Sequence, residues 1–164
     1  MKHLELAKYI DHTLLNPSAT PNDILTICEE AKHYKTASVC VNSCYVPLVH
    51  QALLGSGVMT CCVVGFPLGA MSTEAKAEEA RLAVQDGAEE IDMVQNIGYV
   101  KAGEWTKVEQ DTVPVGCPFC VVRIFLCPVK MNLSNSSIFP MGSPRNDIFL
   151  ICASCCQWGP ALLQ

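Results

Sequence analysis

The stretch Val58-Met-Thr-Cys-Cys-Val-Val-Gly-Phe-Pro-Leu-Gly-Ala70 joins an apolar run of strand length to a loop of glycine and proline. Residues 72–86, rich in Ala, Glu and Lys, then predict a helix that Gly87 ends, and Glu90-Ile-Asp-Met-Val-Gln95 predicts the next strand. A strand, a helix and a second strand in this order form a crossover unit, which favours parallel pairing. Both strands are nearly continuous apolar runs, as expected where both faces of a sheet are covered.

The same alternation extends in both directions from this unit. Thr20 suits the cap of a helix that begins at Pro21, with Asp23 in its first turn. Four β/α units fit either a doubly wound sheet or part of a closed eight-stranded barrel, and a whole barrel needs roughly 200–250 residues. The sequence therefore predicts an α/β fold with about half of a barrel's units. The other predicted elements are strands at 9–15 and 37–41 and helices at 47–54 and 103–111.

Composition divides the chain near Asp111. Residues 1–111 carry 8 Lys and Arg against 15 Asp and Glu, whereas residues 112–164 carry 3 against 1. The second part also holds six of the ten prolines and six of the eleven cysteines. Because proline interrupts helices and central strands, we predict a barrel-type domain over 1–111 and an irregular Cys/Pro-rich tail over 112–164.

Charge and hydropathy exclude several classes of protein. A net charge of −5 argues against nucleic acid or an anionic membrane as the main partner. The first eight residues show no signal-peptide pattern, and no apolar run reaches the roughly 18 residues of a membrane span. Cys40, Cys61 and Cys62 lie inside strand-like apolar runs, where cysteine behaves as a small hydrophobe. We therefore expect reduced thiols and a cytoplasmic protein.

Asp92 is the strongest candidate for chemistry. If Ile91 and Met93 face the helices, the alternation of a strand turns Asp92 toward the barrel interior. A carboxylate there is desolvated, which raises its pKa and suits proton transfer. The alternative is a structural acid paired with a neighbouring lysine.

Asp11, Thr13 and Cys40 are weaker candidates on neighbouring strands. Asp11 and Thr13, two residues apart, face the same side of their strand and suit a polyol substrate, or else bond the adjacent backbone. Cys40 lines the site or fills the core, and His12, facing the helix layer, is read as structural. The loop 65–70 matches neither common phosphate-binding glycine pattern.

The tail contains Cys117-Pro-Phe-Cys120 and Cys152-Ala-Ser-Cys-Cys156. Two such pairs suggest zinc, but their separation exceeds the usual spacing of about 15–20 residues. A zinc-binding tail on an inert scaffold is kept as one alternative function.

Four segments together resemble the deoxyribose-phosphate aldolase family in order and spacing over about residues 4–111. They are Ile10-Asp-His-Thr-Leu-Leu15, Ala37-Ser-Val-Cys-Val-Asn42, Val63-Val-Gly-Phe-Pro-Leu-Gly-Ala70 and Glu90-Ile-Asp-Met-Val94. The resemblance implies a β/α barrel and a class I aldolase without metal or other cofactor. Such an enzyme cleaves 2-deoxy-D-ribose 5-phosphate to acetaldehyde and D-glyceraldehyde 3-phosphate through a lysine Schiff base. It also implies that Asp92 relays protons and that Asp11, Thr13 and Cys40 line the substrate site.

The family's two active-site lysines are not recognisable in this sequence. Neither a Lys-Thr-Ser-Thr-Gly-Phe-like nor a Gly-Gly-Ile-Arg-like segment is present, Lys130 matches neither, and Lys76 and Lys101 stand where the family uses lysine without catalysis. We therefore expect no aldolase activity from this chain as it stands. The tail then suggests a foreign reading frame or unspliced sequence. A further alternative is a non-catalytic half-barrel that pairs with a partner or with its own copy through open sheet edges.

Overall fold

The computed structural model describes residues 6–112 and the backbone of residues 121–125. Five parallel strands form one sheet whose spatial order, β1-β2-β3-β4-β5, is also the chain order. The strands are β1 (Asp11–Leu14), β2 (Ser38–Val41), β3 (Met59–Val64), β4 (Glu90–Val94) and β5 (Val121–Phe125). The α/β fold predicted from the sequence is confirmed.

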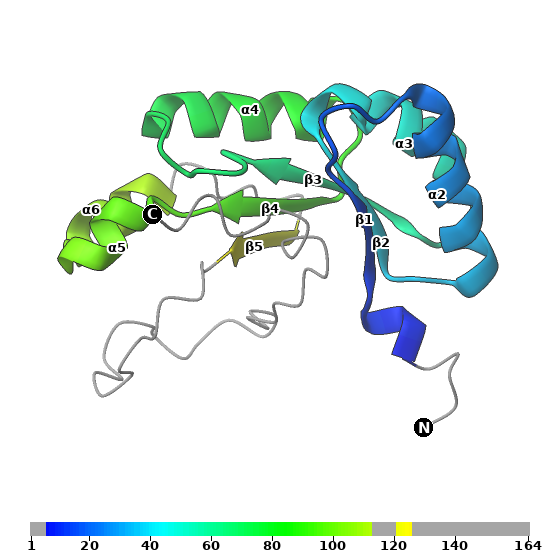
Figure 1. Ribbon diagram of the computed structural model, residues 1–164, viewed down its shortest axis with the longest axis horizontal. Helices are drawn as coiled ribbons and strands as arrows, with labels where there is room; N and C mark the ends of the chain where they lie inside the picture. The colour runs from blue at the N-terminus through cyan, green and yellow to red at the C-terminus, as the bar shows by residue number, and fades with distance from the viewer. Residues whose placement is uncertain (1–5, 113–120, 126–164) are drawn as a thin grey trace.

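Helices follow β1 to β4; those after the first three of these strands lie along one face of the sheet, and the two after β4 lie beyond its carboxyl end (Figure 1). The α-helices are α2 (Pro21–Tyr34), α3 (Val46–Leu53), α4 (Thr73–Gln85), α5 (Ile97–Ala102) and α6 (Trp105–Thr112), and the short 3-10 turns are η1 (Ala7–Tyr9) and η2 (Ser43–Tyr45). Among the described residues, no helix combines the length and the apolar composition needed to cross a lipid bilayer.

The start of α2 follows from local sequence. Thr20 accepts a hydrogen bond from the backbone N–H of Asp23, and the Asp23 carboxylate accepts one from the N–H of Thr20. This reciprocal capping satisfies two backbone donors that a helix leaves open, and Pro21 at the first position lacks such a donor. The predicted cap is therefore confirmed.

Two apolar clusters join the helices to the sheet. Ile24 of α2 and Val49 of α3 pack against Val39 and Val41 of β2. The second cluster joins α4 to β3 and β4 and consists of Val46, Cys62, Val64, Ala80, Ala83, Ala88, Ile91 and Met93. These contacts show which face of β2, β3 and β4 is covered by helices. His12 of β1 bonds Glu30 of α2 at 2.7 Å, so its predicted position toward the helix layer is confirmed.

Two elements differ from the sequence-based expectation. Residues 97–102 form α5, where no helix is predicted, and Asn96 caps it by accepting from the N–H of Tyr99. Strand β5 lies in the stretch expected to be irregular, and it pairs in parallel with β4 from Glu90 to Val94. The strand repeat thus continues beyond Asp111, although the division of the chain into two parts stays a prediction.

Candidate active site

Asp92 lies on the face of the sheet away from the helices. Ile91 and Met93, its neighbours on β4, pack with Ala80 and Ala83 of α4, so strand alternation directs Asp92 to the opposite side. Its side chain is buried, with 4% of its surface exposed. The predicted orientation of Asp92 is confirmed, while its chemical role stays a prediction.

Cys40 meets Asp92 on this inner face. The Cys40 thiol donates to Oδ2 of Asp92 at 3.8 Å, although the two residues are far apart in sequence. Cys61 of β3 stands beside Cys40 in the strand register. The ligand atoms of Cys40, Cys61 and Asp92 all lie within 4.8 Å of one another, and all three residues are buried.

Both thiols of this group are held in the neutral form. A hydrogen bond with Cys61 lowers the pKa of the Cys40 thiol, but burial and the Asp92 charge outweigh it, so the pKa is raised. Burial raises the pKa of Cys61 well above its ordinary value. Neither thiol is therefore an activated nucleophile at neutral pH.

Asp11 and Thr13 lie on β1, at the edge of the sheet. Oδ1 of Asp11 accepts from the hydroxyl of Ser38 at 2.7 Å, and the hydroxyl of Thr13 donates to the backbone carbonyl of Asp11 at 2.8 Å. Thr13 is in register with Cys40, so the strands bring both residues to the same face as the inner group. The Thr13 hydroxyl thus makes a hydrogen bond to the adjacent backbone, which is the alternative that the sequence left open beside contact with a substrate.

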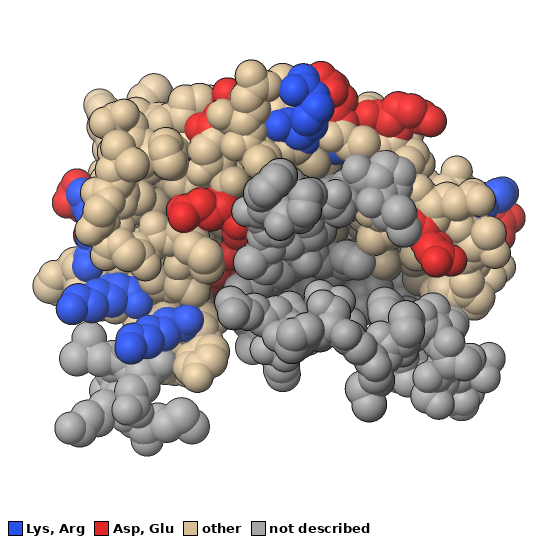
Figure 2. All heavy atoms as spheres, turned by 180° about the vertical axis from the view of Figure 1, so that it is seen from behind, with Lys and Arg blue, Asp and Glu red and all other residues tan. Residues whose placement is uncertain are grey.

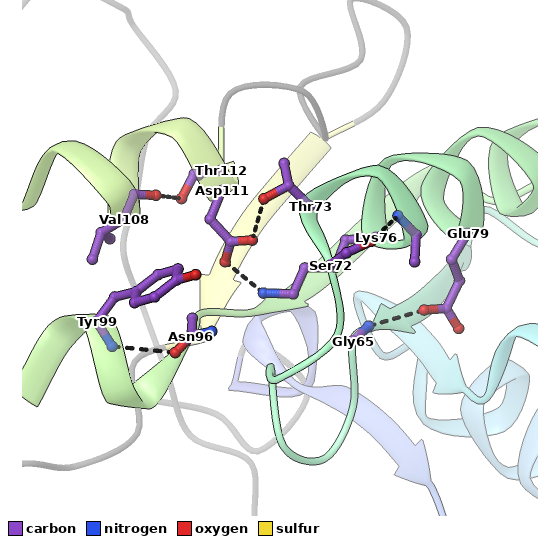
Figure 3. Close-up of polar contacts among 11 residues, drawn as sticks. Gly65, Ser72, Thr73, Lys76, Glu79, Asn96, Tyr99, Val108, Asp111 and Thr112 are labelled. Atoms are coloured by element: carbon purple, nitrogen blue, oxygen red, sulfur yellow. Dashed lines mark hydrogen bonds and ion pairs between the residues drawn. The ribbon is translucent and has the colours of Figure 1, made fainter. Parts of the chain in front are cut away.

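The loop after β3 closes over the carboxyl end of the neighbouring strand. Gly69 has φ +62°, and a Cβ atom there would lie 2.0 Å from the carbonyl oxygen of Gln95, just past β4. The carboxylate of Glu79 holds the start of the loop by accepting from the N–H of Gly65 at 2.9 Å (Figure 3). It also accepts from the hydroxyl of Ser43 at 3.0 Å. Carboxyl ends of strands are where β/α barrels place their sites.

A buried ion pair lies behind this loop. Nζ of Lys76 contacts Oδ2 of Asp111 at 2.5 Å, and the hydroxyl of Thr73 donates to the other carboxylate oxygen at 3.0 Å (Figure 3). Lys76 is fully buried, and its Cε atom is 3.2 Å from the position of a Cβ on Gly65. The pair joins α4 to α6 and packs under the loop.

Sequence reasoning missed three features of this region. Lys76 was placed on a helix without a partner, although it lies four and seven residues before the buried Ala80 and Ala83, on the same helical face. Cys61 and Glu90 were not named as site residues, although alternation puts them on the faces of Cys40 and Asp92. The paired tail cysteines lie outside the described residues.

Comparison with known proteins gives the same family as the sequence motifs. No family model matches the chain. Deoxyribose-phosphate aldolase of Finegoldia magna is 58% identical over 108 residues, covering 66% of this chain and 51% of that enzyme. The enzyme of Actinobacillus succinogenes is 46% identical over 128 residues, covering 77% of this chain and 57% of its own length. Because this match covers 77% of the 164 residues, it must include residues after Asp111, whichever residue it starts from.

Solved structures agree with the sequence matches. A structure described as a deoxyribose-phosphate aldolase from Coccidioides immitis is similar with a TM-score of 0.73 and 39% identity, covering 76% of this chain and 50% of that one. The chain spans about half the length of the curated relatives it matches. In sequence and in fold, the described part of the chain is thus similar to about half of a deoxyribose-phosphate aldolase.

Proposed function

We propose that the inner face around Asp92 is the proton-relay part of a class I aldolase site for 2-deoxy-D-ribose 5-phosphate. The observation that carries this proposal is a carboxylate buried in mid-strand, beside the Cys40 thiol, on the face turned away from the helices. A carboxylate in that position exchanges protons with a carbon or oxygen of a bound substrate without competition from bulk water. Asp11, Thr13 and Cys40 are the proposed substrate-lining residues.

We further propose that this chain, as it stands, does not turn over substrate. A Schiff-base nucleophile must be a neutral amine with access to the carbonyl carbon. Of the lysines in the described residues, Lys76 alone is buried, and its Nζ atom is engaged by the Asp111 carboxylate rather than open to a substrate carbonyl. The others lie on exposed or partly exposed surface, and Lys130 lies outside the described residues. Within the described part of the chain, the proposed relay is therefore present without the group it serves.

A retro-aldol assay tests this pair of proposals. The purified chain is incubated with 2-deoxy-D-ribose 5-phosphate, and triose phosphate is measured through a coupled dehydrogenase, with the Finegoldia magna enzyme as active control. We expect no product and no lysine adduct after borohydride reduction. Product formation, or an adduct on any lysine, contradicts the proposed inactivity.

A chimera separates the relay from the missing nucleophile. Residues 1–111 are joined to the part of the Finegoldia magna enzyme that its match with this chain does not cover. We expect this chimera to be active and its Asp92→Asn variant to lose at least about 100-fold in kcat, the usual contribution of a general acid–base group. A folded, inactive chimera, or an active Asn variant, argues against Asp92 as the relay.

A second candidate function is self-association of a non-catalytic half-barrel. It is favoured by the place of β1 at the edge of the sheet, where its residues are half-buried and one row of backbone groups has no strand beside it among the described residues. A relative from Aeropyrum pernix, 29% identical, is described as tetrameric. Sedimentation at several concentrations tests this: a mass that rises with concentration supports it, and a constant monomer mass excludes it.

Two further proposals concern the cellular setting of the protein and the origin of its tail. We propose a cytoplasmic setting because buried, unpaired thiols are stable under reducing conditions: Cys28, Cys40, Cys61 and Cys62 are all free and buried. The truncated, foreign-frame origin of the tail is tested by reading the encoding DNA in the other frames after the Asp111 codon. An aldolase-like continuation there supports it, and its absence contradicts a frameshift.

A further inference from the structure

Two thiols and a carboxylate converge on the inner face from three adjacent strands. Cys40 of β2 and Cys61 of β3 are register partners, while Asp92 of β4 lies one pleat further along, opposite Val63. Their sulfur and oxygen ligand atoms all lie within 4.8 Å of one another. Rigid parallel strands, rather than a loop, hold the three residues in place.

This set of donors matches the preferences of a thiophilic metal ion. Zinc binds thiolate sulfur at about 2.3 Å and carboxylate oxygen at about 2.0–2.2 Å, so ligand atoms around a tetrahedral ion stand roughly 3.5–3.8 Å apart. The three atoms here need to approach by about 1 Å or less to reach that arrangement. Magnesium and calcium are disfavoured because two of the three donors are sulfur.

The other two buried cysteines in the described part of the chain lack this arrangement. Cys28 packs among Ile24 and Ala31 in the apolar cluster under α2. The Cys62 thiol donates to the carbonyl oxygen of Val63 and faces the α4 cluster. Burial in the core thus does not by itself place a cysteine beside a carboxylate, and these two residues provide matched controls.

We propose that Cys40, Cys61 and Asp92 form a binding site for a thiophilic divalent metal ion such as zinc. Binding releases one proton from each thiol, so two thiolates and one carboxylate leave the bound ion with a net charge of −1 at the site. The released protons make the affinity rise with pH. The consequence for catalysis rests on the proposed function: a metal on the Asp92 carboxylate withdraws it from proton transfer, so the ion inhibits the active chimera.

Cadmium is the probe for the site, because its thiolate complexes absorb in the near ultraviolet. The reduced full chain is titrated with Cd²⁺, alongside Cys40→Ala/Cys61→Ala and the control Cys28→Ala/Cys62→Ala. The chain's six tail cysteines add their own signal, so the comparison is between variants. We expect the first double variant to bind one equivalent fewer than the control. Equal stoichiometry in the two variants overturns the proposal.

A second measurement needs no cysteine variant. Each thiol is alkylated in mild denaturant with and without Cd²⁺, and the labelled positions are mapped by mass spectrometry. We expect the metal to slow labelling of Cys40 and Cys61 at least tenfold relative to Cys28 and Cys62, and Asp92→Asn to reduce that protection. Equal slowing at all four cysteines contradicts a site.

These readouts are independent of aldolase activity. If the chimera is active but Cd²⁺ neither binds nor protects, the metal site is wrong and the proposed function stands. If Cd²⁺ binds as expected but Asp92→Asn leaves the chimera active, the site stands and the assigned relay is wrong.

Discussion

The two ends of the sheet use different chemistry to bury the same kind of strand. Under α2 and α3, the side chains that meet β2 are apolar, and the ion pair of Lys32 with Glu29 lies toward the surface. Under α4 and α6, Lys76 and Asp111 are paired in the interior with 0% and 3% of their side chains exposed. The candidate site lies beside the second kind of packing.

This difference predicts that the two ends of the sheet accept amino-acid substitutions to different extents. An apolar interface accepts other side chains of similar volume with modest loss of stability. A buried ion pair is stable only while both charges are present, because removing one leaves the other desolvated and uncompensated. We therefore expect the α4–α6 end to set the limits on sequence change. Figure 2 shows that acidic and basic side chains are also exposed to solvent on one face of the described residues.

The largest effect is expected from Lys76→Met. The variant keeps the volume of the side chain but leaves the Asp111 carboxylate buried without its cation, which costs about 3–5 kcal/mol in the free energy of unfolding. Urea unfolding followed by circular dichroism measures this loss.

A double variant shows whether the charge or the shape is responsible. Lys76→Met/Asp111→Leu removes both charges and should recover most of the lost stability, because paired apolar replacements are often neutral. A loss below about 1 kcal/mol for Lys76→Met alone would mean that Asp111 reaches water or another partner.

Alkaline pH should weaken both ends of the sheet. Burial raises the pKa of Cys28 to about 11, and burial raises the pKa of Cys62 further still. An unfolded thiol ionises near about pH 8.5, so above that pH the unfolded chain loses protons that the folded chain retains. Stability is therefore full below about pH 8.5 and declines as pH rises toward the folded-state values.

Urea midpoints at several pH values between neutral and alkaline test this slope. Cys28→Ala is the matched variant, because it leaves every lysine and tyrosine in place while removing one shifted thiol. We expect a shallower decline in that variant. An unchanged slope would assign the decline to other groups.

Thr20→Ala tests a local contribution at the apolar end. Loss of the hydroxyl leaves the backbone N–H of Asp23 without its capping acceptor and should cost about 1 kcal/mol. Thermal unfolding, compared with Thr20→Ser as the capping-competent control, measures it. Equal losses in the two variants would contradict a role for the cap.

The smallest effect is expected from Lys32→Met. Lys32 pairs with Glu29 one helical turn away, at 2.5 Å, but the Glu29 side chain is 72% exposed. Such pairs contribute about 0–1 kcal/mol and are screened by salt. Because Lys32→Met and Lys76→Met exchange the same residue types, they differ mainly in how buried the ion pair is. An equal loss in the free energy of unfolding for both variants would contradict the proposed difference between the two ends of the sheet.

The sequence predicts strands and helices well where the apolar periodicity agrees with residues that begin or end a helix. Thr20 and Pro21 mark the start of α2, and Gly87 follows the end of α4, because capping and backbone freedom act locally. The orientation of Asp92 follows equally from the alternation of Ile91 and Met93. These features depend only on neighbours in the chain.

Features that depend on distant partners could not be predicted in the same way. The sequence shows which face of the helix Lys76 occupies. Burial of the Lys76 side chain, however, requires the Asp111 carboxylate, which is on α6 and far along the chain. The meeting of Cys40 with Asp92 requires the register of three strands. Strand β5 was missed because nearby prolines and low charge outweighed a short β-branched run, while pairing with β4 supplied the missing stabilisation.

The identity of spatial and chain order in the sheet has a consequence for synthesis on the ribosome. Each new strand docks against the one made just before it, so no segment waits for a partner encoded much later. Domains emerge at about 5–20 residues per second, slowly enough for each β/α unit to settle on its predecessor. A polypeptide interrupted at any later point would already carry an assembled N-terminal nucleus, which helps to explain how half of a barrel reaches an ordered arrangement.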